Sequence, residues 1–593
     1  MNTRSLVALA LSFMAIVVVR WSTLDPRKEL SWDVFGYYLY APSVFIHGDL
    51  KLDDISWIHD AQQTYGTTET LYQITDAPDG SRMFFFLMGM SILYSPFFLI
   101  GHLWAFASGA PMDGFSEPYQ WALGLGGTLY SLIGLYFLRR ILLRYFSDVV
   151  TAAVIIVIVL GTNYFQFSTI KNLETANFLF TGVAWMTWST IRWHETFRRV
   201  DLIQIAIAIG LITLVKPSEI ICGLVPLLWG IHDRTTLTAK VNIMRVHRRD
   251  LMIAILIGLF VLSPQLIYWK WRTGQFIYDS YRNPGVGLDL FTPHIWETLF
   301  SFRKGWLIYT PIMLLALIGI PRLRKTLPHA FLPVLIHSIV AFWIISSWSE
   351  WWYGASFSIR PMITLYPLLA IPLGITLQAF AQKGGSMKIA LATTIVLLIG
   401  LNLFQMWQLN NWVIHPYRTT TAYYWKVFGR TTVPHGAHEL LSVERRFDGK
   451  EVFVDTTGYR TIELITDRSS ASAELDTLTK NDPFLPIIEV PYSDITSADH
   501  FWARPSAEVL VPDEGAQKAA VLVVRMERKE GGYGERTFQV PDHTSPGEWV
   551  TIKGDFMTPE IRSRSDRFKV YLWIRDGDTA FVRAPRVTAF LPD

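Results

Sequence analysis

Long apolar stretches recur along this chain from the N-terminus to about Leu409 and then stop. A helix that crosses the hydrocarbon core of a bilayer needs roughly 20 predominantly apolar residues. The chain has 593 residues, 51% of them hydrophobic, and the apolar residues are gathered in blocks of about that length. The sequence therefore predicts a polytopic α-helical membrane protein that ends in a domain of different composition.

We predict about eleven transmembrane helices from these blocks. The first lacks a following small-residue cleavage pattern and is read as a retained helix. The fifth and sixth are short and meet at Lys216-Pro217, where proline suits a helix break. The predicted spans are Ser5–Leu24, Glu117–Leu138, Val149–Thr169, Asn172–Trp193, Leu202–Val215, Ser218–His232, Leu251–Trp269, Trp306–Ile320, His329–Ser346, Pro361–Phe380 and Met387–Leu409.

Basic residues fall mainly in the connectors on one side of these spans, and that bias sets the orientation. We expect a cytoplasmic N-terminus, with the first loop (residues 20–116) and the tail on the outer side. A further apolar segment, Met83–Ala107, would reverse this order if it crossed. We therefore expect it to lie in or dip into the outer interface, broken by Gly89 and Pro96.

The net charge argues against a nucleic-acid partner, and the cysteine content excludes sites built from several cysteines. A net charge of +3 is too small to indicate a nucleic-acid partner. The single cysteine, Cys222, excludes a disulfide framework and a thiolate metal cluster.

Two carboxylates are placed at the predicted outer surface. Asp33 follows the first span among aromatic residues, and Glu174 opens the fourth span. A charge near the bilayer is costly unless it is solvated or paired, which makes Asp33 a functional candidate. The alternatives are a solvated loop aspartate for Asp33 and a favourable helix-dipole position for Glu174.

Basic and aromatic residues converge on the same predicted face. A lysine between two apolar spans needs an anion, although it can also snorkel to the interface. Arginine beside carboxylates and aromatic rings suits phosphate binding and sugar stacking, whereas tryptophans alone are typical of an interfacial belt. These candidates are Lys216, Arg303, Lys304, Glu350, Trp352, Tyr353 and Arg360.

The order of these elements resembles the GT-C glycosyltransferases, and most of all their protein O-mannosyltransferase and aminoarabinose transferase branch. The resemblance covers about residues 1–410 and rests on Asp33 in SWDVFGYYLYAPSVFIHGDL, Glu174 in NLETANFLF and Lys216 in IGLITLVKPSE. The segments FSFRKGWLIYTPIMLLALIGI and WWYGASFSIRP also look like outer-face motifs of bacterial relatives. The mannosyltransferases carry an Asp-Glu pair after the first span, whereas here Val34 follows Asp33.

The resemblance implies transfer of a sugar, with inversion, from a polyprenyl-phosphate donor to a lipid, glycan or protein acceptor at the extracytoplasmic face of a bacterial inner membrane. It implies catalytic roles for Asp33, as the base, and Glu174. Lys216 and Arg360, with Arg303 or Lys304, would bind the donor phosphate. Glu350, Trp352 and Tyr353 would contact acceptor or sugar. A divalent cation is possible, but no ligand spacing assigns one.

From about residue 411 the apolar residues alternate, which predicts an extracytoplasmic all-β sandwich of jelly-roll type that resembles carbohydrate-binding modules. We read Trp502, Tyr533 and Trp573 as core or rim residues. The predicted strands are EVFVD, TIELIT, IIEVPY, AVLVVRMER, TFQV, WVTIKGDF, KVYLWIRD and FVRAPRVTAFL.

Two other functions remain open at this stage. A transporter or flippase of lipid-linked glycans would use a similar number of spans, but internal repeats and midplane charges are typical of transporters, and neither is evident here. A membrane-anchored sugar-binding protein would leave the many spans unexplained.

Overall fold

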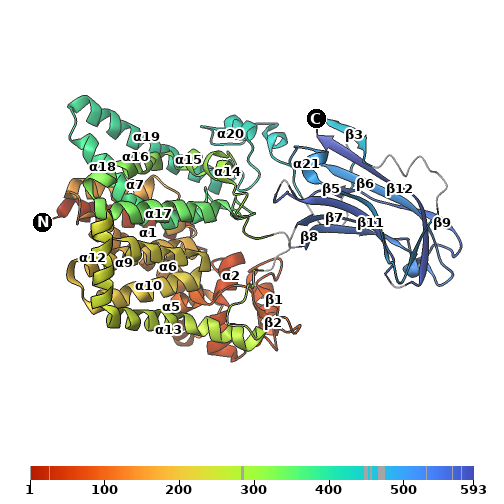
Figure 1. The fold of residues 1–593 in the computed structure, drawn as a ribbon, viewed down its shortest axis with the longest axis horizontal. Helices are drawn as coiled ribbons and strands as arrows, with labels where there is room; N and C mark the ends of the chain where they lie inside the picture. Colours follow the sequence, from red (N-terminus) through yellow and green to blue (C-terminus); the bar gives the residue numbers. More distant parts are fainter. Residues whose placement is uncertain are drawn as a thin grey trace. The chain divides into compact units, whose positions relative to one another are not determined.

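The computed structural model describes residues 2–25, 27–281, 286–445, 452–454, 457–464, 475–528, 531–563, 565–575 and 577–592. The chain divides into two compact units, a helical one and a β-rich one (Figure 1). The helical unit comprises Met1–Tyr281, Pro293–Ser347 and Trp351–Leu441. The β-rich unit comprises Arg282–Thr292, Trp348–Glu350 and Ser442–Asp593.

Seven of the described helices are long and apolar enough to cross a membrane. The predicted polytopic helical fold with a C-terminal β domain is thereby confirmed. These helices are α1 (Thr3–Thr23), α5 (Gly89–Ser108), α6 (Glu117–Leu142), α13 (Arg248–Thr273), α17 (Pro328–Ser346), the continuous segment of η4 (Arg360–Leu365) and α18 (Tyr366–Ala381), and α19 (Gly385–Asn410).

Several predicted spans are broken or short in the structure. The third divides into α7 (Asp148–Leu160) and α8 (Tyr164–Ser168), and the eighth into α15 (Trp306–Tyr309), η3 (Pro311–Met313) and α16 (Leu314–Thr326). The sixth is η2 (Pro217–Gly223) followed by α11 (Leu224–Leu228). The fourth and fifth are the single helices α9 (Thr175–Thr196) and α10 (Arg199–Val215). Glycine and proline at the junctions explain the breaks, because they end helices or distort them.

The expectation for Met83–Ala107 is wrong in one respect. Residues 82–84 form strand β2, which pairs with β1 (Ile74–Asp76), and α5 then runs unbroken from Gly89 through Pro96. Pro96 has no N–H for the Ile92 carbonyl four residues earlier, and proline inside a membrane helix is tolerated where neighbouring helices pack on it. The Tyr130 hydroxyl donates to the adjacent Leu93 carbonyl in the same turn, at 3.2 Å.

The β-rich unit is an antiparallel sandwich, as predicted. Its six-stranded sheet contains β10-β6-β12-β3, with β4 on β12 and β9 on β6, and its four-stranded sheet has the order β5-β11-β7-β8. Alternate residues of both sheets share one apolar core. The strands are β3 (Tyr459–Glu463), β4 (Asp476–Thr479), β5 (Phe484–Pro491), β6 (Trp502–Leu510), β7 (Val521–Arg528), β8 (Gly531–Phe538), β9 (Trp549–Lys553), β10 (Phe556–Met557), β11 (Arg567–Trp573) and β12 (Thr579–Pro592).

The sequence pattern missed two strands and misplaced one. Strands β4 and β6 were not predicted. β6 contains Pro505 and alternates strictly between half-buried and buried residues. In the predicted strand EVFVD, residues 452–454 are not in a strand, and its ends lie outside the described residues.

Candidate active site

Asp33 lies in the first turn of α2 (Trp32–Tyr38), a short helix of the first loop. Gly36, one turn further on, packs directly on Phe86, because a Cβ at this glycine would lie 2.4 Å from the Phe86 ring. This close packing anchors the helix that carries Asp33 on the segment after strand β2.

Arg360 joins the two predicted carboxylates into one cluster. Its Nη1 and Nη2 donate to Asp33 Oδ2 at 3.2 and 3.1 Å, and Nη1 also donates to Glu174 Oε2 at 2.9 Å. Glu174 is the N-cap residue of α9, and Arg360 begins η4. The Asp33 and Arg360 side chains remain about a quarter exposed (26% and 24%), so the cluster is accessible to a ligand.

Tyr72 and Lys171 complete this cluster at its two ends. The Tyr72 hydroxyl donates to Asp33 Oδ1 at 2.7 Å. Burial, followed by the charge of Asp33, raises the pKa of Tyr72 well above its ordinary value, so Tyr72 stays a neutral donor. Lys171 Nζ lies 3.9 Å from Glu174 Oε1 and donates to the Ala355 carbonyl at 2.7 Å.

Tyr72→Phe tests whether this hydroxyl orients Asp33. A neutral hydrogen bond contributes roughly 0.5–1.5 kcal/mol, so we expect about a 3- to 10-fold loss of turnover at unchanged donor affinity. Steady-state kinetics on the purified protein would measure both quantities. An equal loss in donor affinity would show that Tyr72 serves binding and not the orientation of Asp33.

Lys216 is held at the end of α10, in contact with the start of α5. A Cβ at Gly89 would lie 2.3 Å from the Leu214 carbonyl carbon, so glycine permits this contact between the two helices. Lys216 Nζ pairs with Glu219 Oε1 at 3.3 Å and lies 5.9 Å from the centre of the Tyr353 ring. The Tyr353 hydroxyl donates to the Ile345 carbonyl at 2.8 Å, which fixes this ring beside Lys216.

Arg303 and Lys304 lie against the segment that leads into Arg360. The Arg303 guanidinium carbon is 4.1 Å from the centre of the Trp352 ring, a cation–π contact. Lys304 is 1% exposed and donates to the Ser356 carbonyl. Burial lowers the pKa of Lys304 well below its ordinary value, and the charges of Lys171, Arg303 and Arg360 lower it further.

Glu350 has a different environment from the other predicted residues. It belongs to the β-rich unit, where its Oε1 pairs with Arg562 Nη2 at 2.7 Å. The structure thus brings together Asp33, Glu174 and Arg360, places Lys216 beside Tyr353 and Arg303 beside Trp352, and leaves the acceptor role of Glu350 a prediction.

Tyr72 and Lys171 were missed as site residues in the sequence. Lys171 stands three residues before Glu174, and a lysine and a glutamate at that spacing can pair, so this signal was available. Tyr72 lies in an irregular part of the first loop, where no periodicity indicates which side chain it meets.

The described residues contain no group of three or more histidine, cysteine, aspartate or glutamate side chains that could hold a metal ion. In the carboxylate cluster the guanidinium of Arg360 stands between the carboxylates of Asp33 and Glu174. The cationic group of this cluster is therefore supplied by the chain itself.

Comparisons with known proteins give weak structural similarities. No protein-family model matches the sequence, and no curated protein matches it. ArnT from Cupriavidus metallidurans, solved bound to undecaprenyl phosphate, is 16% identical with a TM-score of 0.40, over 65% of this chain and 63% of that one. Arabinosyltransferase EmbB from Mycobacterium smegmatis is 11% identical with a TM-score of 0.35, over 99% of this chain and 64% of that one.

The chain spans less than two thirds of the length of either neighbour. Both similarities are too weak to identify the chemistry of the site in this chain.

Proposed function

We propose that this protein transfers a sugar from a polyprenyl-phosphate donor to an acceptor hydroxyl or amine at the extracytoplasmic membrane surface. The observation that carries the proposal is the accessible Asp33–Arg360–Glu174 cluster, beside further cations at the ends of apolar helices. A carboxylate suits proton removal from an acceptor, and neighbouring cations suit a phosphate leaving group.

Asp33 is the proposed base. A carboxylate offers about four acceptor positions; Tyr72 uses one on Oδ1, and the two nitrogens of Arg360 use those on Oδ2. The remaining position, on Oδ1, is where an acceptor hydroxyl or amine would donate. The acceptor atom then bonds to the anomeric carbon, the bond from that carbon to the phosphate oxygen breaks, and Asp33 takes the proton.

The leaving phosphate needs positive charge close to the carboxylate cluster. In that cluster Asp33 and Glu174 compensate most of the charge of Arg360. We therefore propose Lys216, Lys171 and Arg303, which lie around the cluster, as further phosphate ligands, with Arg360 sharing its donors between phosphate and Asp33. Buried Lys304 is not proposed as a direct phosphate ligand, because its amino group already donates to the Ser356 carbonyl and burial disfavours its charged form.

Lys216→Ala tests the phosphate site. A hydrogen bond to a charged group contributes roughly 1.5–3 kcal/mol, so we expect donor affinity to weaken about 10- to 100-fold, with a smaller effect on turnover at saturating donor. Binding of a polyprenyl-phosphate sugar, measured by microscale thermophoresis in detergent, would check this.

Two controls separate donor binding from folding. Lys216→Ala leaves the buried Glu219 carboxylate without its partner, whereas the double variant Lys216→Ala/Glu219→Gln removes both charges. Lys383→Ala removes an exposed lysine elsewhere. Normal donor affinity in the double variant would take Lys216 out of the phosphate site.

A further inference from the structure

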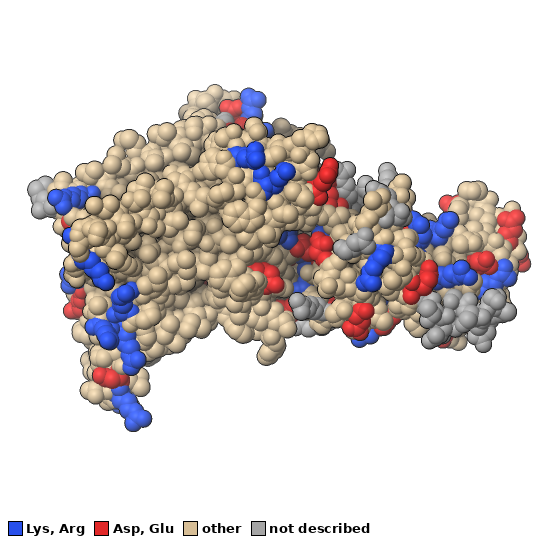
Figure 2. Space-filling model, turned by 90° about the horizontal axis from the view of Figure 1, so that it is seen from above, with Lys and Arg blue, Asp and Glu red and all other residues tan. Residues whose placement is uncertain are grey.

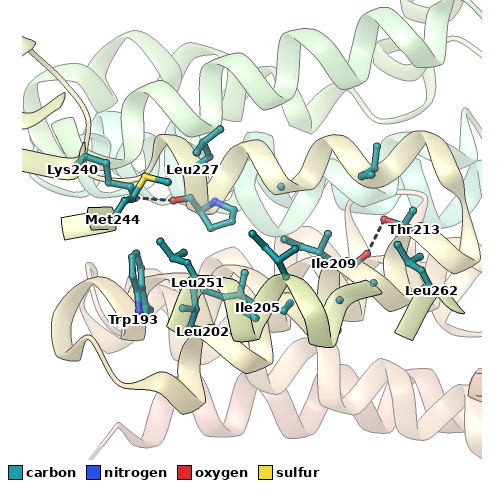
Figure 3. A pocket seen from close by; sticks show the side chains of 18 residues that line it. Trp193, Leu202, Ile205, Ile209, Thr213, Leu227, Lys240, Met244, Leu251 and Leu262 are labelled. Atoms are coloured by element: carbon teal, nitrogen blue, oxygen red, sulfur yellow. Dashed lines mark hydrogen bonds between the residues drawn. The ribbon is translucent and has the colours of Figure 1, made fainter. Parts of the chain in front are cut away.

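An apolar pocket lies between helices at the arginine-rich end of the helical unit, where the predicted inner leaflet would be. Its cavity volume is ≈ 290 Å³, and its walls come from α9, α10, η2, α11, α12 (Arg234–Val246) and α13. Figure 3 shows Trp193, Lys240 and Met244 at one end and Thr213 and Leu262 at the other. This pocket has no part in the reaction proposed above.

The pocket opens toward the surface that would face lipid. Ile255 on α13, Ile220 on η2 and Leu227 on α11 all line it and are 61%, 55% and 48% exposed. The wall formed by α10 runs from Leu202 to Thr213, about 16 Å at the helical rise of ~1.5 Å per residue. One leaflet of a hydrocarbon core is about 15 Å thick, so the pocket matches one acyl chain in length.

Lys240 lies at one end of the pocket, and its ammonium group is not available to a ligand. Its Nζ donates to the carbonyls of Pro226 and Trp229 at 2.8 and 3.1 Å, which fastens α12 to the end of α11. The N-terminus of α12 is closed by a capping box between Asp233 and Thr236. These contacts hold the amphipathic helix α12 in place as one wall of the pocket.

Exposed arginines stand just beyond this end of the pocket. Arg245 follows the lining residue Met244, and Arg248 lies one turn before the lining residue Leu251, on the same face of α13. Three arginines here are exposed and make no salt bridge within the described residues: Arg245, Arg248 and Arg249. The nearby Asp250 carboxylate pairs with Arg199 instead, with Nε and Oδ1 2.6 Å apart. Lysine and arginine gather at this end of the unit, where the N-terminus and α12 lie (Figures 1 and 2).

We propose that this pocket holds one acyl chain of an anionic phospholipid, with the phosphate against Arg248 and its neighbours Arg245 and Arg249. Clustered arginines at the membrane surface attract anionic headgroups. The headgroup is placed at this end of the pocket because three exposed arginines lie there, whereas Lys216 beyond the opposite end is assigned to the donor phosphate above. This lipid site is separate from the proposed transfer site.

Native mass spectrometry of the purified protein with added phosphatidylglycerol or phosphatidylcholine tests this site. We expect phosphatidylglycerol to bind at least about tenfold more tightly than phosphatidylcholine. Arg248→Ala/Arg249→Ala is expected to remove most of that preference, and Lys216→Ala to leave it unchanged.

A bulky side chain introduced inside the pocket provides a second, independent test. A Cβ at Gly223 would have its nearest neighbour 3.9 Å away, so Gly223→Phe can fill the pocket. The matched control is Gly400→Phe, at a glycine of α19 whose Cβ would meet nothing within 4 Å. We expect Gly223→Phe to lower phosphatidylglycerol binding about tenfold and Gly400→Phe to leave it unchanged.

Two results would overturn the inference. Equal binding of both phospholipids would show that the arginines select no headgroup. Dependence on Lys216, with displacement by a polyprenyl phosphate, would assign the pocket to the chain of the donor.

Discussion

Asp33→Asn is expected to lower the rate of sugar transfer about 10²–10⁴-fold, the range that a well-placed general base contributes. The amide keeps an oxygen that can accept from Tyr72 but cannot take the proton of the acceptor. Donor affinity should change little, because the cations proposed to hold the phosphate are still present. The measurement is turnover at saturating donor and acceptor, alongside a thermal melt of the same preparation.

The matched control is Asp53→Asn, an exposed aspartate of the same loop. It is expected to retain normal turnover. Transfer at the wild-type rate by a folded Asp33→Asn protein would remove Asp33 from the role of base.

Replacement of Arg360 is expected to have the second largest effect. Its guanidinium donates through two nitrogens to Asp33 and through one of them to Glu174 as well. In Arg360→Lys, a single ammonium cannot reproduce the fork geometry of a guanidinium. We expect turnover to fall about 10²-fold, because the loss of one positioned donor at a developing charge has effects of about 10²–10³.

Arg360→Ala is expected to be less stable than Arg360→Lys, since two neighbouring carboxylates then lose their common partner. With the cluster partly exposed, we expect a loss of about 1–3 kcal/mol in the free energy of unfolding. Adding Glu174→Gln to Arg360→Ala should recover part of the stability and none of the turnover. Recovery of both would mean that Arg360 acts on folding alone.

The composition of the chain predicted the helical unit and the β sandwich because both leave periodic patterns. Long apolar blocks indicate membrane helices, and alternation from residue 411 onward indicates strands. Breaks such as the one between α7 and α8 depend on tertiary packing. The continuity of α5 through Pro96 depends on its packing against neighbouring helices, which no local pattern reveals.

The sequence predicted that Asp33, Glu174 and Arg360 share one membrane face, but not their ion pairs. Asp33 and Arg360 are 327 residues apart, and a pairing over that separation is set by the whole helical unit. Lys171 and Glu174 are close in sequence, and their contact could have been predicted from their spacing. The contact between Tyr72 and Asp33 could not, because it is made within an irregular loop.

The central claim is that the protein cleaves the bond between a sugar and a polyprenyl phosphate. The most direct measurement incubates the purified protein, reconstituted in vesicles, with a panel of polyprenyl-phosphate sugars and follows release of free polyprenyl phosphate by mass spectrometry. The account predicts that at least one donor is consumed, with sugar appearing on an acceptor or in water, and that Asp33→Asn slows this release. Movement of intact lipid-linked sugar across the bilayer, with no polyprenyl phosphate released, would contradict the account and identify a transporter.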